Sequence, residues 1–417
     1  MNSKLIGIIK ALGPGILFAG AAIGASHLIQ STRAGASFGF ALLPMVILSN
    51  LFKYPFFEFG QRYPNICNES LIDGYNKLGN WEVKVFFILN LFTSVISTCG
   101  VTIVTSALSI SFLKLFNIDI NINLMTAIIL ISTILLLKIG QYNLLDKIVK
   151  ILIFTLTIFT TIAFVVALIN GNQIKPDFIE PHLWEMANVG FLISLMGWMP
   201  APIEASVWQS LWALERVKST NYKPTLKETL TDFNIGYIIT SVLAVFFVGL
   251  GALVMYGSGE VFSDSGIVFS SQVISLYVKT LGNWSLPIIT VIALITMAST
   301  TLTVVDAYPR SLENCINIIF TKTKENKNVY WIIISLMSLF SFVILMIFTD
   351  KLKTMVDFAT AISFLSAPIF GYLNYKLVTS DLMPEHAKPN MILKVLSWVG
   401  LIFLTLFSLF YIWSLIR

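Results

Sequence analysis

Five ionisable side chains lie within, or at the ends of, long apolar stretches of this 417-residue sequence. They are Arg33, Glu58, Glu204, Asp306 and Arg310. If those stretches cross a bilayer, a charge that faced lipid would be costly, so we expect these side chains to face other helices. Ionisable residues at membrane depth commonly mark ion pathways and gates.

Two residues combine such a position with useful chemistry. His27 lies inside an apolar stretch and titrates near neutral pH, so it could contact a cargo or accept a proton. The plainer interpretation is a histidine that is merely hydrogen-bonded. Glu204 lies four residues after Pro200 and could place a negative charge in a cavity, or it could pair with Arg33 or cap a helix end. His27 and Glu204 are therefore candidates for proton or ion coupling.

The other ionisable residues are candidates for gates. Asp306 and Arg310 are spaced i, i+4, so they share a helix face and can pair, either as a gate or as a structural ion pair. Glu58 lies just beyond the second apolar stretch and Asp232 opens the seventh, and either could belong to an inner gate. Arg33 follows the first stretch and completes this group.

The composition identifies the medium in which these residues work. Hydrophobic residues make up 56% of the chain and charged residues 12%, and the mean hydropathy is +0.82. These values exclude a water-soluble globule, a disordered chain and a coiled coil. Three cysteines, Cys67, Cys99 and Cys315, lack disulfide or zinc spacing. No ATP-binding Gly-x-x-x-x-Gly-Lys-Ser/Thr signature occurs, and we expect no cofactor and no nucleic-acid partner.

Eleven uncharged runs are long enough to cross a bilayer as helices. They are 11–32, 34–52, 85–113, 120–137, 151–174, 186–203, 233–259, 280–305, 328–349, 358–375 and 395–416. The uncharged segment 265–278 is shorter and suits a helix at the surface. We therefore predict an all-α integral membrane protein of one domain, 1–417, with eleven transmembrane helices and no removable signal peptide.

The distribution of positive charge predicts the orientation. A cytoplasmic N-terminus places 20 of the 27 Lys and Arg residues on the inner side, where such residues accumulate. Because the number of spans is odd, the C-terminus is then extracytoplasmic. We expect a multi-pass protein of the cell membrane. No soluble domain can be cut from the chain, which favours a transporter over a receptor and leaves a membrane enzyme or sensor as the rival class.

Two spans carry helix breakers near their centres. The first contains Gly20 and Gly24, and the sixth contains Gly197, Pro200 and Pro202. A glycine inside a helix costs about 1 kcal/mol and a proline about 3 kcal/mol, so we expect both helices to break and to line a cavity. Close packing at glycines is the alternative. Breaks at matching positions of spans 1–5 and 6–10 predict an inverted repeat with the substrate between its halves.

On these residues the chain resembles the NRAMP family of divalent-metal transporters. It keeps Gly-Pro-Gly at 13–15, Ala-Gly-Ala at 34–36 and Met-Pro at 199–200, with weaker likeness at 136–141 and 299–303. The resemblance covers most of the chain. It implies a LeuT-type fold with repeats at about 10–171 and 186–377 and an extra helix at about 391–416. It also implies that the protein is not an enzyme.

The chain departs from the family at its metal site. The family's Asp-Pro-Gly-Asn is Gly-Ala-Ser-His at 24–27, and its Met-Pro-His is Met-Pro-Ala at 199–201. The family's acidic positions in span 3 fall near Ser97 and Gly100, and its polar ligand in span 10 falls near Thr360. A bare divalent cation needs anionic or strongly dipolar oxygen ligands. We therefore expect a degenerate site that is weak for Mn or Mg.

The resemblance and the helix breaks together imply a set of substrate-binding residues. The set is Gly24, Ser26, His27, Met196, Met199, Ala201, Glu204 and Thr360. Within it, Met199 and His27 could hold a soft metal weakly. The leading hypothesis is a secondary-active transporter that carries a metal or small cation by alternating access. The alternative is a small organic solute, an amine or amino acid, held between Trp198 and Trp208.

Overall fold

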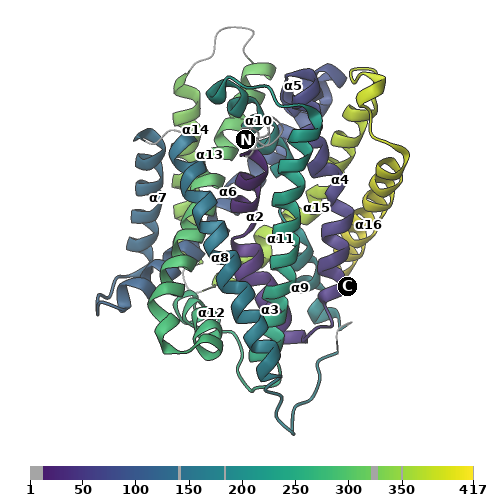
Figure 1. Ribbon diagram of the computed structural model, residues 1–417. Helices are drawn as coiled ribbons and strands as arrows, with labels where there is room; N and C mark the ends of the chain where they lie inside the picture. Colours follow the sequence, from purple (N-terminus) through teal and green to yellow (C-terminus); the bar gives the residue numbers. More distant parts are fainter. Residues whose placement is uncertain (1–12, 140–141, 183–184, 321–326, 349–350, 417) are drawn as a thin grey trace, which may run out of the picture.

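The computed structural model describes residues 13–139, 142–182, 185–320, 327–348 and 351–416, and this part of the chain is helical without a strand. Most helices stand side by side in one upright bundle, and the peripheral α7 and α16 expose most of their surfaces (Figure 1). The unbroken long helices are α4 (Leu43–Cys67), α6 (Asn80–Lys114), α7 (Ile122–Ile139), α8 (Tyr142–Asn170), α11 (Leu226–Val254), α13 (Leu286–Ile319), α14 (Lys327–Ile347), α15 (Leu352–Thr379) and α16 (Met391–Ile416).

Both predicted breaks are present. The first span consists of α2 (Pro14–Ala22), a π-helical turn (Ser26–Ser31) and α3 (Thr32–Phe38), with the break at 23–25. The sixth span consists of α9 (Met186–Gly197) and α10 (Ala205–Thr220). The residues between α9 and α10 include both prolines of the Pro-x-Pro pair, which together remove two backbone donors within three residues.

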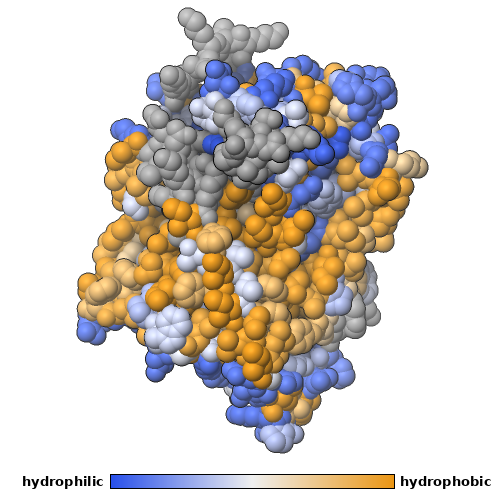
Figure 2. Space-filling view, viewed as in Figure 1, coloured by the Kyte–Doolittle hydropathy of each residue, from blue (hydrophilic) through white to orange (hydrophobic). Residues whose placement is uncertain are grey.

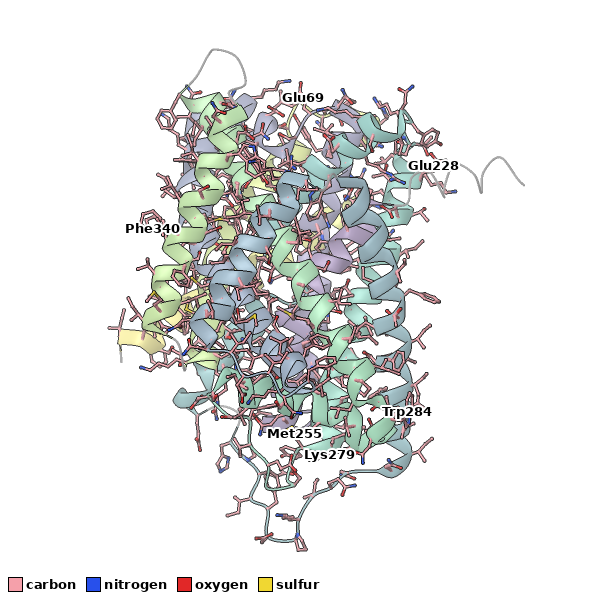
Figure 3. All side chains as sticks on the ribbon, turned by 90° about the vertical axis from the view of Figure 1, so that its left-hand side faces the viewer. Glu69, Glu228, Met255, Lys279, Trp284 and Phe340 are labelled. Atoms are coloured by element: carbon pink, nitrogen blue, oxygen red, sulfur yellow. The ribbon has the colours of Figure 1, made fainter. Side chains whose placement is uncertain are left out.

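The surface matches a protein that crosses a bilayer. Eight of the described helices are long and apolar enough to span a membrane, and α4 with the two broken spans completes the predicted eleven. Figure 2 shows an apolar band across the middle of one face of the molecule, with hydrophilic residues above and below it. In Figure 3, Glu69 and Glu228 lie at one end, Lys279 lies at the other, and Phe340 points outward between them. Phe340 is exposed, as expected for a lipid contact.

Two short helices lie outside these spans. The predicted surface helix is α12 (Gly266–Leu281), which buries one face, including Phe269 and Tyr277, against the bundle. A second, α5 (Leu71–Leu78), follows α4 and begins with a capping box made by Ser70 and Asp73. The prediction that segment 265–278 is helical is therefore confirmed. Helix α5 was not predicted, because it carries charged residues and has no apolar run.

The predicted boundaries of the second span are wrong. Residues 34–38 belong to α3, and the second span is α4, which begins at Leu43 and continues past Lys53 and Glu58 to Cys67. Ending a span at the first charged residue fails here, because Lys53 and Glu58 are buried inside the bundle with polar partners. Two other predicted limits are wrong for the same reason. The tenth span begins at Leu352, before the predicted residue 358, and the sixth span continues in α10 to Thr220, beyond the predicted residue 203.

Helix α11 holds both halves of the broken first span in place. It packs along α2, along the π-helical turn and along α3. The approach is closest at Gly35, where an added Cβ atom would lie 1.9 Å from the carbonyl oxygen of Val248. Only glycine allows this contact, which accounts for the Ala-Gly-Ala motif at 34–36. Across the bundle, α6 packs along α13, and these two helices form the opposite wall of the site.

Candidate substrate site

A small cavity of about 30 Å³ lies between the two helix breaks. The residues around it come from both breaks and from α6, α10 and α13: Ala21, Ala22, Ala25, Ser26, Ser97, Val101, Trp198, Pro200, Ala201, Pro202, Ala205, Trp208, Thr300, Val304 and Tyr308. A water molecule needs roughly 10–15 Å³ measured in this way, so the cavity admits a water-sized group or a small ion. In this conformation an amino acid does not fit.

Most of the residues that line the cavity are apolar, and its polar groups are neutral: the hydroxyls of Ser26, Ser97, Thr300 and Tyr308. The Ser26 hydroxyl donates to the carbonyl oxygen of Ala22 at 2.6 Å and approaches that of Pro200 at 3.4 Å, which links the two breaks. The Thr300 hydroxyl donates to the carbonyl oxygen of Gly20 at 3.2 Å. Hydroxyl and carbonyl oxygens are ligands for hard cations, but they supply no negative charge.

The carboxylate of Glu204 lies directly behind this lining. Its Oε1 accepts a hydrogen bond of 3.0 Å from the hydroxyl of Tyr308, and that hydroxyl is also 3.0 Å from Oγ of Ser97. Glu204 is fully buried, and its Oε2 has no hydrogen-bond partner among the described residues. The ring of Trp208 meets the ring of Tyr308 edge-on at 4.8 Å. A negative charge therefore reaches the cavity through one hydroxyl group and does not contact it directly.

Gly24, the position of the family's aspartate, cannot take a side chain in this arrangement. An added Cβ atom would lie 2.4 Å from Oγ1 and 2.8 Å from Cγ2 of Thr300. Thr300 therefore occupies the space that a side chain at position 24 would need. A side chain at position 24 and the side chain of Thr300 therefore exclude one another.

The structure turns His27 away from the cavity. Its Nε2 is 2.9 Å from the carbonyl oxygen of Thr240 on α11, and its Nδ1 is 3.1 Å from that of Ala22 and 2.6 Å from the hydroxyl of Ser26. Since both ring nitrogens have protein partners, His27 joins the π-helical turn to α11. It is not among the residues that line the cavity.

The other predicted residues divide clearly. Ser26 and Ala201 line the cavity, whereas Met196, Met199, Glu204 and Thr360 do not. Both methionine side chains pack in the apolar core. Among the described residues, no three His, Cys, Asp or Glu side chains lie close enough together to hold a metal ion. The structure thus does not bring the predicted Met199 and His27 pair together as cavity ligands.

A polar network joins the first, sixth and tenth spans on one side of the breaks. Arg33 makes two hydrogen bonds with Asp357 of α15, at 2.7 and 3.0 Å. Gln30 bonds to both members of this pair, Ser194 donates to Asp357 at 2.8 Å, and the hydroxyl of Thr360 is 2.7 Å from that of Ser194. The proposed pairing of Arg33 with Glu204 is therefore wrong. Asp357 escaped prediction because the uncharged run begins one residue after it.

Polar contacts also join helices on the other side of the breaks. Asp232 of α11 accepts hydrogen bonds from the backbone amides of Gly13 and Gly15, at 3.1 and 2.6 Å, and so caps the start of α2. Glu58 pairs with Arg62 inside α4.

The predicted pairing of Asp306 with Arg310 is confirmed. The distance between the guanidinium and the carboxylate is 2.7 Å. Tyr330 of α14 donates a further hydrogen bond of 2.7 Å to Asp306. This second partner ties the pair to a neighbouring helix.

Lys53 is a buried residue that the sequence analysis overlooked. Its ammonium group, fully buried in α4, donates to the carbonyl oxygens of Met196 and Gly197 at 2.7 Å each and to that of Ala201 at 3.3 Å. In the sequence analysis it is only one of the positive charges on the inner side. The sequence does contain a signal for its burial: this lysine lies between apolar and aromatic residues and has no acidic neighbour one helical turn away.

Eleven spans, two interrupted helices that meet at a small cavity, and polar networks on both sides of it define a multi-pass membrane transporter with the LeuT-type inverted repeat. The family model for Nramp, described as natural resistance-associated macrophage protein-like, matches residues 15–414. The chain belongs to the Nramp family, whose members are membrane transporters.

Known proteins similar to this chain agree with that assignment. An uncharacterized protein of Pasteurella multocida (strain Pm70) is 40% identical over 96% of this chain and 92% of its own length. The divalent metal cation transporter MntH of Staphylococcus haemolyticus (strain JCSC1435) is 26% identical over 59% of this chain and 56% of its own. A crystal structure of the Eremococcus coleocola manganese transporter has a TM-score of 0.71 at 15% identity, over 98% of this chain and 87% of its own. These similarities give no support to an enzyme, a sensor or a carrier of organic solutes.

Proposed function

We propose that this protein carries divalent metal ions across the cell membrane by alternating access, with its N-terminus in the cytoplasm and its C-terminus outside. One observation carries the proposal: a cavity of about 30 Å³ between the two breaks, of a size for an ion, with the side chains of Ser26, Ser97, Thr300 and Tyr308 among otherwise apolar lining residues. The similarity to a divalent metal cation transporter of Staphylococcus haemolyticus and to a manganese transporter of Eremococcus coleocola supports the choice of cargo.

The chemistry of the cavity limits how the ion is held. Hydroxyl groups of Ser26, Ser97, Thr300 and Tyr308 offer neutral ligands, and Glu204 contributes its charge through Tyr308. A divalent ion in such a site retains part of its hydration shell, as Mg²⁺ commonly does in proteins. Weak binding and limited discrimination among hard divalent ions follow.

The two polar networks suit the roles of gates. With the proposed orientation, the Arg33–Asp357 pair closes the outer side, and the Asp232 cap on α2 closes the inner side. Each network joins helices of different repeats, at about 10–171 and 186–377, so that movement of one repeat against the other breaks one network at a time. Glu204 is the proposed coupling residue because it is the carboxylate linked to the cavity by a hydrogen bond.

The test is uptake of Mn²⁺ and Mg²⁺ into proteoliposomes with a matched pair of variants on α13. Val304 lines the cavity, whereas Val291 is exposed on the apolar surface of the same helix. Val304→Phe should block uptake and Val291→Phe should leave it unchanged. If both variants take up metal equally, the cavity is not the path. If the unaltered protein takes up amines or amino acids but no metal, the proposed cargo is wrong.

A further inference from the structure

The break of the sixth span contains a cation that belongs to the protein itself. The ammonium group of Lys53 enters from α4 and meets the carbonyl oxygens of Met196, Gly197 and Ala201 at 2.7, 2.7 and 3.3 Å. An ammonium group has three N–H donors, and three carbonyl acceptors satisfy all of them. Lys53 has no exposed surface. Its contacts are therefore complete without water.

These carbonyl groups would attract a cation even without Lys53. Met196 and Gly197 are the last residues of α9, so their carbonyl oxygens lie at the negative end of the helix dipole. Ala201 is in the break, where Pro200 has removed a backbone donor. Rings of backbone carbonyl oxygens replace the hydration shell of potassium in ion channels. An ammonium ion and a potassium ion have nearly the same radius, so one geometry serves both.

The charges nearby fit a monovalent cation. Glu204, three residues beyond Ala201, lies close enough to Lys53 for electrostatic interaction, and it is buried with one oxygen unpaired among the described residues. One positive and one negative charge balance in this region. A divalent ion in the place of the ammonium group would leave an uncompensated charge away from water, which is unfavourable.

We propose that the carbonyl oxygens of Met196, Gly197 and Ala201 form a monovalent-cation site that Lys53 fills from within. The protein thereby supplies its own cation at the break, and a diffusible ion is kept out. The transported ion is confined to the cavity between the two breaks, which Ala201 also lines. Only this last consequence rests on the proposed function, whereas the site itself does not.

Removal of the lysine side chain should turn the occupied site into an open one. In Lys53→Ala, K⁺, NH4⁺ and methylammonium should each raise the melting temperature of the purified protein relative to choline at equal ionic strength. Choline is too large to reach three converging carbonyl groups. The melting temperature should rise with K⁺ concentration, as it does for any ligand that binds only the folded state.

Two variants serve as controls. Lys53→Met fills the same space with an uncharged side chain, so its melting temperature should not respond to K⁺. Lys376→Ala removes a lysine that bonds to a carboxylate, Glu82, and not to carbonyl groups. It gives the baseline for unspecific effects of salt. The unaltered protein should be as insensitive as Lys53→Met, because its site is full.

Each result decides the matter. Equal melting temperatures of Lys53→Ala in K⁺ and in choline would overturn the proposal, as would the same response to K⁺ in Lys53→Met. If Lys53→Ala is not recovered folded, Lys53→Ser replaces it, because it also removes the ammonium group and leaves room for an ion. If neither variant folds in K⁺, NH4⁺ or methylammonium, the proposal is also overturned, because no diffusible cation then replaces the ammonium group. Melting measurements need no metal transport, so they stand even if the cargo is different.

Discussion

The two helix breaks solve the same backbone problem with different chemistry. In the first span the break at 23–25 is followed by a π-helical turn whose polar groups, including Ser26 and His27, bond to nearby carbonyl groups and to α11. Among the residues that the structure describes, no charged side chain bonds to this break. In the sixth span a lysine satisfies the carbonyl groups and a carboxylate begins the next helix. The first break is thus bonded by neutral groups, whereas charged groups, Lys53 of α4 and Glu204, lie at the second.

The largest effect should come from removing the charge at the sixth break. Lys53→Met removes the hydrogen bonds of the lysine to three buried carbonyl groups and leaves Glu204 without its nearby positive charge, and we expect a loss of about 3 kcal/mol in the free energy of unfolding. His27→Gln at the neutral break should cost about 1 kcal/mol. Thermal unfolding in detergent, followed by tryptophan fluorescence, measures both. Equal losses would mean that the two breaks do not differ in this way.

The second-largest effect concerns the coupling of metal uptake to a proton gradient. Glu204 reaches the cavity through Tyr308, whereas His27 points to α11. Glu204→Gln should therefore abolish the response of uptake to an imposed pH gradient, and His27→Gln should retain it. Uptake of Mn²⁺ into proteoliposomes at several internal and external pH values provides the measurement. Loss of the pH response in His27→Gln alone would assign coupling to the first break.

A smaller effect is expected when a charge is added to the neutral break. Gly24→Asp by itself should impair folding or uptake, because its Cβ atom collides with Thr300. Combined with Thr300→Ala, the aspartate gains room, and Mn²⁺ should bind about tenfold more tightly, or about 1.4 kcal/mol. Calorimetric titration of the double variant and of Thr300→Ala compares the two. Unchanged affinity would show that a carboxylate at position 24 does not face the ion.

The smallest effect is expected away from both breaks, at the pair that closes the proposed outer side. Arg33 and Asp357 are partly exposed, with 11% and 30% of their side-chain surfaces accessible. Asp357→Asn retains hydrogen bonds but loses the charge, which should weaken closure by about 1 kcal/mol. The labelling rate of a cysteine introduced at Thr360 should rise about fivefold. A rate equal to that of the same cysteine without Asp357→Asn would exclude this pair as a gate.

The sequence predicted the fold well because its signals are long and strong. Uncharged runs mark helices, and the closely spaced Gly197, Pro200 and Pro202 mark a break where single prolines, such as Pro55 in α4, do not. The site was predicted less well, because side-chain direction depends on the partner helix. His27 lies next to the cavity-lining Ser26 yet points to Thr240, and no rule on spacing reveals this.

Charged residues caused the remaining errors. A rule that ends a span at each charge removed Lys53 and Asp357 from their helices, although both are bonded within the bundle. Their partners are separated from them by more than 140 residues in the sequence. Such partners become visible only when the helices are packed. The two residues with the most direct bearing on the helix breaks were thus the hardest to predict.

The Asp232 cap on α2 has a consequence for how this protein tolerates mutation. The carboxylate bonds to backbone amides of Gly13 and Gly15, which every residue except proline possesses. The cap therefore requires only one particular side chain, that of Asp232, because its partners are backbone amides. Substitutions at the start of the first span are limited instead by steric overlap. An added Cβ atom at Gly15 would lie 2.3 Å from the carbonyl oxygen of Asp232.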